Sequence, residues 1–275
     1  MTSQASRSAS PLTPSPLLRE TIGSIAVLTL DSSSTRNALS EAMIEALHSE
    51  LNSIRDERRV RAVVIAANGP AYSSGHNLKE LTARRADADK GRAYFAHMMK
   101  SCSDMMQAIV HLPKPVVAAV QGVATAAGCQ LVATCDLAVA SEKAIFGTPG
   151  IDIGLFCSTP MVALTRNVPR KHAMHMLLTG DHIPAQRALE LGLVNSVVPA
   201  GTEREAAIEL ANRIALKSAY TLKIGKEAFY RQAEMNLADA YTYAAQVMTE
   251  NMMARDAEEG IGAFIEKRDP KWEDR

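Results

Sequence analysis

Apolar side chains between residues 40 and 55 recur at intervals of three and four positions, which is the period of one helix face. Ser40 precedes this stretch, where a helix N-cap is expected. A β-rich stretch at 22–30 comes before the helix, and a strand at 60–67, ended by the turn signal at 68–70, comes after it. The predicted buried face of the helix consists of Met43, Ile44, Leu47, Leu51 and Ile54.

A second round of strands and helices follows. Residues 92–111 carry one apolar stripe rich in methionine, which predicts a helix that packs on the core and ends before Pro113. An apolar run at 116–120, a short helix at 127–134 and a strand at 137–140 come next. Continuous apolar strands that alternate with helices are typical of parallel sheets joined by right-handed crossovers. The sequence therefore predicts an α/β fold.

The pattern becomes helical from residue 184 onward, with a break at 193–199, and it ends in one long predicted helix at 237–267. The apolar positions of this helical part need a cover, so we expect it to pack on the core or on another subunit, and we expect an oligomer. The first 17 residues are rich in Ser, Thr and Pro and read as a disordered tail. We thus expect a tail at 1–17, a core at 18–200 and a helical oligomerisation region at 201–275.

Composition narrows the class of partner. The chain has 275 residues, with 30 Lys and Arg balanced by 30 Asp and Glu, so charge gives no support to nucleic acid or an anionic membrane as partner. No apolar run approaches the roughly 18 residues that span a bilayer, which predicts a soluble protein. The four cysteines lack metal-ligand spacing, which predicts no metal site and indicates reduced thiols in a cytoplasmic protein. A mitochondrial transit peptide is a second interpretation of residues 1–17.

Two loops, at 70–81 and 121–130, each follow a buried strand, where ligands bind in parallel sheets. Both loops place small residues where a backbone must come close to something; these are Ser73, Ser74 and Gly75 in the first loop and Ala124, Ala126, Ala127 and Gly128 in the second. The second loop opens into a helix, and the free N–H groups at a helix start can stabilise an oxyanion. Taken alone, each loop is equally compatible with a tight structural turn. Neither has the glycine spacing of a nucleotide-binding loop.

Six segments of the chain, read together, resemble one known family. They occur in family order from about Ile22 to Trp272 and are similar to segments of the enoyl-CoA hydratase/isomerase (crotonase) family. The segments are RNALS at 36–40, YSSGHNLKEL at 72–81, AAVQGVATAAGCQLVATCDLAVAS at 118–141, FGTPGIDIGL at 146–155, TGDHIPAQRALELGLVNSVVP at 179–199 and EGIGAFIEKRDPKW at 259–272.

The resemblance implies a crotonase-like spiral of strand-strand-helix turns with a helical C-terminal trimerisation region. It implies assembly as a homotrimer or a dimer of trimers. The implied ligand is an acyl-CoA thioester, in which CoA belongs to the substrate and no separate cofactor is needed. The implied chemistry is polarisation of the thioester carbonyl by two backbone N–H groups, which map onto His76 and Ala127.

Contacts with CoA carry over to Ala38 and Lys79 beside the site entrance, and to Phe264 and Lys267 from the C-terminal helix of an adjacent subunit. Lysines suit CoA phosphates as point charges. For Lys267 a second reading is a solvated charge at the end of a helix.

The chain departs from the family pattern at both catalytic carboxylates. Hydratases of this family read GGGCE and FGQPE, and their two glutamates hold and activate water; here the positions are Gln130 and Gly150. An amide does not exchange a proton near neutral pH and glycine offers no group, so we expect hydration to be severely impaired. Five other side chains near the mapped site could supply chemistry but each also has a structural reading: His76, Glu80, Asp152, Cys157 and Ser158.

The sequence therefore predicts an acyl-CoA-processing enzyme, nominally an enoyl-CoA hydratase/isomerase of fatty-acid metabolism, that lacks both hydratase glutamates. One alternative is an acyl-CoA-binding protein without hydratase activity. Another is a decarboxylase or thioesterase that acts on CoA thioesters, because decarboxylation needs enolate stabilisation more than a general base.

Overall fold

The computed structural model describes residues 15–275, so residues 1–14 of the predicted tail lie outside the described residues. The first strand, β1 (Leu17–Ile22), begins at Leu17, the last residue of the tail predicted at 1–17, and pairs antiparallel with β2 (Ile25–Leu30). Gly23 turns the chain between them with a φ of 59°, a left-handed conformation that glycine adopts without strain. The β-rich stretch at 22–30 is thus the end of one strand, a turn and a second strand.

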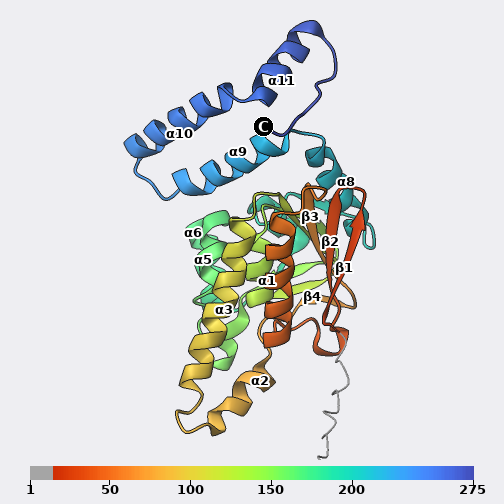
Figure 1. Ribbon diagram of the computed structural model, residues 1–275. Helices are drawn as coiled ribbons and strands as arrows, with labels where there is room; N and C mark the ends of the chain where they lie inside the picture. Colours follow the sequence, from red (N-terminus) through yellow and green to blue (C-terminus); the bar gives the residue numbers. More distant parts are fainter. Residues whose placement is uncertain (1–14) are drawn as a thin grey trace, which may run out of the picture.

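Three consecutive strand-strand-helix units build the centre of the molecule (Figure 1). The first strands of the units lie side by side in one sheet, and the second strands lie side by side in another. This is the spiral that was expected. The units are β3 (Ala62–Ala67), β4 (Ala71–Ser73) and α3 (Arg92–Val110); β5 (Val116–Val120), β6 (Val123–Thr125) and α4 (Ala127–Thr134); and β7 (Leu137–Ser141), β8 (Ile145–Gly147) and α5 (Pro160–Asn167).

The remaining elements lead into these units, connect them or follow them. Before and between the strands lie η1 (Ser33–Thr35), α1 (Glu41–Arg55), α2 (Leu78–Ala83), η2 (Arg84–Ala86) and η3 (Pro149–Ile153). After α5 come α6 (Arg170–Thr179), β9 (Ile183–Pro184), α7 (Ala185–Glu190), β10 (Ser196–Val198), α8 (Glu203–Ala215), α9 (Ala219–Gln232), α10 (Leu237–Met252) and α11 (Arg255–Glu266).

The two sheets are largely parallel, as predicted. The larger has the order β1-β2-β3-β5-β7-β10, and every pair after the first hairpin is parallel. The smaller has the order β4-β6-β8-β9, with β9 antiparallel at its edge. Because β4 and β6 are neighbours, the loops that follow them leave the sheet at the same edge.

Both faces of the larger sheet are buried at its central strands β2, β3, β5 and β7, which explains why these strands are continuously apolar. Side chains alternate between two clusters: Ile25 and Val27 point to one, Ala26 and Leu28 to the other. Helix α8 covers the first face with alanines at every fourth position, and α1 and α3 cover the second. The prediction for α1 is confirmed, since its five named apolar residues are buried and the Ser40 hydroxyl accepts a hydrogen bond from the Met43 N–H.

The single helix predicted at 237–267 is wrong, because the chain forms α10 and α11 with a break after Met252. Asp256 supplies the reason. Its side chain is 2% exposed and accepts hydrogen bonds from the backbone N–H groups of Glu273 and Asp274, at 2.7 and 3.0 Å. This contact fixes the start of α11, and helical periodicity carries no sign of it.

Helices α9, α10 and α11 extend away from the spiral (Figure 1). They expose large apolar side chains, as expected of a region that needs a cover. Within residues 15–275 no helix is both long and apolar enough for a membrane span. The strongly exposed apolar residues of this region are Phe229, Leu237, Tyr241, Met248, Met252, Met253, Phe264 and Ile265.

A buried polar network joins α9 to the core at Asp136, just after α4. The carboxylate of Asp136 accepts hydrogen bonds from Lys226 Nζ at 2.6 Å and from the Tyr230 hydroxyl at 2.8 Å. Lys226 Nζ also donates to the carbonyls of Ile109 at 2.9 Å and Lys114 at 3.0 Å, so all the donors of the ammonium group have acceptors. Burial lowers the pKa of Lys226, and the charge of Asp136 opposes this effect.

Replacement of Lys226 by Met should destabilise the protein by about 3 kcal/mol, because it leaves the Asp136 carboxylate without its buried cationic partner. Urea unfolding measures the free energy of unfolding directly. Lys223→Met is the matched control, since Lys223 lies on the same helix with an exposed side chain. Equal unfolding midpoints for the two variants would contradict this account of how α9 is held.

Candidate active site

The loops after β4 and β6 fit into each other through two glycines. A Cβ atom added to Gly75, whose φ is +83°, would lie 2.9 Å from Ala126 Cβ and 3.1 Å from Ala127 N. A Cβ atom added to Gly128 would lie 2.3 Å from the carbonyl oxygen of Ser73. The sequence indicated a close backbone approach at both glycines, and the group that approaches each one is the other loop.

Backbone hydrogen bonds fix the position of each loop. The Leu39 N–H donates to the Gly75 carbonyl at 2.7 Å, within a bridge that pairs Leu39 with His76. The Ala126 N–H donates to the Gly147 carbonyl at 2.9 Å. Ala126 has a φ of 51° and a ψ of −120°, a combination that a residue with a Cβ adopts only under strain. Such strain persists where the surroundings enforce it, and it clusters at functional sites.

The backbone N–H groups of His76 and Ala127 have no protein acceptor within residues 15–275. Ala127 is the first residue of α4, where no carbonyl of the helix can reach its N–H. The side chain of His76 is partly buried, and neither ring nitrogen has a hydrogen-bond partner in the described chain. Burial lowers the pKa of His76, opposed by the nearby Leu39 carbonyl, so the ring is neutral at pH 7.

The two positions at which the resemblance places hydratase glutamates differ in their surroundings. Gln130 is 5% exposed, and its Oε1 has no donor among the described residues. Gly150 is buried, and a Cβ atom there would lie 2.6 Å from the Leu155 carbonyl oxygen and 2.8 Å from Cys157 Sγ. Position 150 therefore has no room for a side chain, whereas position 130 already holds one of glutamate's size.

The other candidate side chains have structural partners. Glu80 accepts hydrogen bonds from the Glu41 N–H at 3.2 Å and from Asn77 Nδ2 at 2.8 Å, so it caps the start of α1. The Ser158 hydroxyl donates to the Phe156 carbonyl at 3.3 Å. The carboxylate of Asp152 packs against Gly180, where a Cβ atom would lie 2.9 Å from its Oδ2.

Cys157 is a thiol that is 8% exposed, and burial raises its pKa, opposed by the backbone of Gly150. Burial also raises the pKa of Cys129 to about 12. Both thiols therefore stay protonated at neutral pH and are poor nucleophiles.

Three residues around the site were not singled out from the sequence. Thr148 and Tyr72 are fully buried, and their hydroxyls have no hydrogen-bond partner within the described residues. His182 is exposed, its ring packs on Gly147, and its Nε2 lies 3.3 Å from Thr125 Oγ1. The sequence gives no indication that His182 lies near the site, because the residues that it contacts, Thr125 and Gly147, are far from it along the chain.

The four residues expected to contact CoA fall into two separate groups. Lys79 is exposed near the start of α2, and Ala38, which is 5% exposed, precedes α1. Phe264, 85% exposed, and Lys267 lie at the end of α11. Figure 1 shows α2 and α11 at opposite ends of the molecule, so a single copy of the chain does not bring the two groups together.

An open cavity of about 530 Å³ lies between α1, α2 and α3. Its lining is mainly acidic, which does not suit a phosphate-bearing ligand. The charged and aromatic side chains that line it are Glu41, Glu45, Glu80, Arg84, Asp87 and Tyr94.

Comparison with known proteins gives the family. The family model described as enoyl-CoA hydratase/isomerase matches residues 20–275. The chain belongs to the enoyl-CoA hydratase/isomerase family. Its fold is that of the crotonases, and as a crotonase it is an acyl-CoA enzyme similar to enoyl-CoA hydratases.

Among relatives, human enoyl-CoA hydratase domain-containing protein 3, mitochondrial, is 46% identical over 94% of this chain and 84% of its own length. The crystal structure of that human protein matches with a TM-score of 0.89 over 94% of this chain and 100% of that one. Enoyl-CoA hydratase from Mycobacterium smegmatis, 46% identical, matches with a TM-score of 0.88 over 94% and 98% of the two chains. The 2,3-dehydroadipyl-CoA hydratase of Escherichia coli is 32% identical over 91% of this crotonase and 96% of its own length.

Replacement of Gly128 by Ala should cost about 3 kcal/mol of stability, because the new methyl group would overlap the backbone of the other loop and neither backbone can yield easily. Thermal and urea unfolding measure the loss. Gly225→Ala is the control: Gly225 lies inside α9 with nothing within 4 Å of an added Cβ, so that change should stabilise the helix by up to about 1 kcal/mol. A Gly128 variant as stable as the control would show that the loops are not packed as described.

Proposed function

We propose that this crotonase binds acyl-CoA thioesters and polarises the thioester carbonyl with the backbone N–H groups of His76 and Ala127. The observation that carries the proposal is that both N–H groups lack a protein acceptor although their loops are in contact at Gly75. Donors that are held in place before the ligand binds stabilise an enolate oxygen without reorganisation. Each such donor contributes on the order of 10²- to 10³-fold in rate.

The reaction proposed here is enolate chemistry that does not depend on a pair of carboxylates. Gln130 and Gly150 provide no proton acceptor, and burial raises the pKa of the Cys157 thiol, which is therefore protonated at neutral pH. Loss of each general acid or base costs about 10²- to 10⁴-fold, so hydration of an enoyl-CoA should be slow. Room for the second glutamate is also absent, because the Leu155 carbonyl and Cys157 Sγ close position 150.

Decarboxylation of a malonyl-type thioester is the second candidate, and one observation favours it. Departure of carbon dioxide leaves the electron pair of the broken bond on the thioester as an enolate, and no base has to remove a proton. The uncharged lining at Gln130 and Gly150 would not repel the carboxylate of such a substrate, whereas two glutamates would. If the protein turns over no CoA thioester, it is an acyl-CoA-binding protein without enzymatic activity.

We further propose that the site is completed in a homotrimer or a dimer of trimers. Helix α11, which carries Phe264 and ends at Lys267, lies at the far end of the molecule from α2, which carries Lys79 (Figure 1), so a second copy has to supply one of the two groups to the same CoA molecule. The exposed apolar side chains of α10 and α11 are the surface that such an assembly would cover.

Infrared spectroscopy tests the carbonyl contacts independently of turnover. Hexanoyl-CoA labelled with ¹³C at the thioester carbonyl should show a lower C=O stretching frequency when bound than in buffer, because two N–H donors weaken the double bond. Hexanoyl-CoA offers no double bond for hydration and no carboxylate to lose. An unshifted frequency at saturating protein would sink the proposal that His76 and Ala127 hold the carbonyl.

A panel of CoA thioesters, followed by mass spectrometry, tests the reaction. We expect hydration of crotonyl-CoA to be at least about 10²-fold slower than with a relative that keeps both glutamates. Conversion of malonyl-CoA to acetyl-CoA would select decarboxylation, and release of free CoA from hexanoyl-CoA would select thioester hydrolysis. Hydration at the rate of the relative would refute the role assigned to the missing glutamates.

A further inference from the structure

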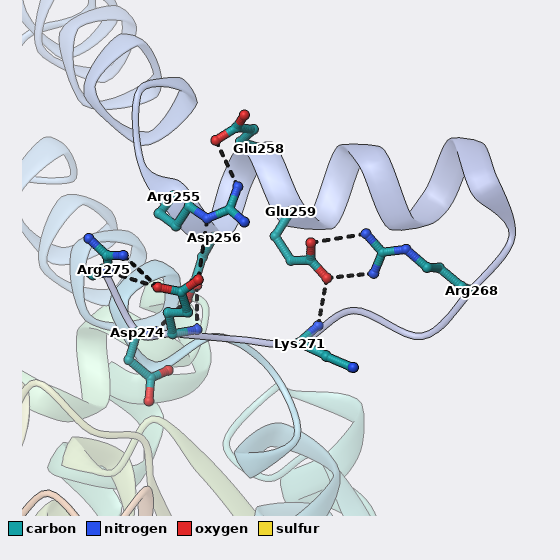
Figure 2. A network of polar contacts seen from close by, with 9 residues as sticks. Arg255, Asp256, Glu258, Glu259, Arg268, Lys271, Asp274 and Arg275 are labelled. Carbon is teal, nitrogen blue, oxygen red and sulfur yellow. Dashed lines mark hydrogen bonds and ion pairs between the residues drawn. The ribbon is translucent and has the colours of Figure 1, made fainter.

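The C-terminal residues 268–275 fold back along α11 and bind it at several points (Figure 2). Glu259 accepts hydrogen bonds from two guanidinium nitrogens of Arg268, at 2.6 and 3.0 Å, and from the Lys271 N–H at 2.9 Å. These bonds lower the pKa of Glu259 to about 2, so the carboxylate stays charged near neutral pH. Asp256, described above, holds the backbone of the same segment from the start of α11.

The other side of this segment is attached to the core. The Trp272 ring lies against Gly260 of α11, where a Cβ atom would be 3.1 Å from two ring carbons, and its Nε1–H donates to the Leu216 carbonyl at 2.8 Å. Asp274 accepts hydrogen bonds from two nitrogens of Arg61, at 2.6 and 3.1 Å, and from the Ala219 N–H at 2.8 Å. The segment thereby links α11 to the residue before β3 and to the start of α9.

These contacts fix which face α11 turns outward. Residues 268–275 meet the helix at Asp256, Glu259 and Gly260, and these positions share one face at helical spacing. Phe264 and Ile265 lie outside that face and are 85% and 72% exposed. Only Asp256 and Ala263 of α11 are buried, so the helix has little other attachment to the chain.

We propose that residues 268–275 act as a positioning strap that sets the orientation of α11 and, through Phe264 and Lys267, the affinity for the CoA part of the ligand. The inference rests on the proposed function, because it takes acyl-CoA as the ligand. Asp256, Trp272 and Asp274 are the positioning residues, and none of them has to touch CoA. Without the strap, α11 would sample orientations around the break after Met252, and only part of the population would be competent to bind.

The test compares Trp272→Ala and Asp274→Asn with Lys271→Ala in the full-length protein. Lys271 is the matched control, because it lies in the strap but contributes its backbone N–H rather than its exposed side chain. Hydrogen exchange of residues 255–267 reports the hold on α11, and calorimetric titration with hexanoyl-CoA reports affinity. If the competent fraction falls to roughly one tenth, the apparent Kd rises about tenfold.

In Trp272→Ala and Asp274→Asn we expect faster hydrogen exchange in α11 and a higher Kd for hexanoyl-CoA. Lys271→Ala should keep wild-type values of both. Trp272→Phe should have an intermediate Kd, because it keeps a ring against Gly260 but loses the indole N–H. Unchanged exchange, or faster exchange with an unchanged Kd, would overturn the strap. So would an affinity loss that appears only in variants whose subunits separate on size exclusion. Wild-type protein that binds no hexanoyl-CoA would instead refute the proposed function.

Discussion

The close backbone contact between the loops after β4 and β6 is the constraint on which the site depends. Gly128 admits the Ser73 carbonyl, and Gly75 admits the start of α4, so each loop occupies the space that a side chain of the other would need. The parallel spiral brings these loops to one edge, and their interlocking then leaves no freedom in where the His76 and Ala127 N–H groups lie. The strained backbone of Ala126 is enforced by the same packing together with its hydrogen bond to Gly147.

Hydrophobic periodicity and turn chemistry were enough to predict much of the fold. The five buried positions and the N-cap of α1, the extent of α4 and the parallel pairing all follow from the local pattern, because burial on one face or on both leaves a direct trace in the sequence. The break between α10 and α11 left no such trace. It arises where the carboxylate of Asp256 binds backbone groups of Glu273 and Asp274, and only the folded chain brings these together.

The candidate site shows the same division. The two loops could be located from the sequence, and the interpretation that Gln130 and Gly150 replace the hydratase glutamates rests on residue identity at positions that the resemblance supplies. The sequence could not predict which groups surround these positions in the folded chain. The approach of Leu155 and Cys157 to Gly150 depends on how the chain turns through η3, and the burial of Thr148 and Tyr72 without partners depends on packing between separate elements.

The close packing around Gly150 also limits which substitutions this position can accept. A hydratase that lost its second glutamate alone could recover it by one reversion, because the cavity would persist. Here the Leu155 carbonyl and Cys157 Sγ occupy the space that a side chain at position 150 would need, so a glutamate introduced there would meet backbone rather than open space. A single substitution at position 150 is therefore not enough to place a glutamate there, and coordinated remodelling of residues 150–157 would be required.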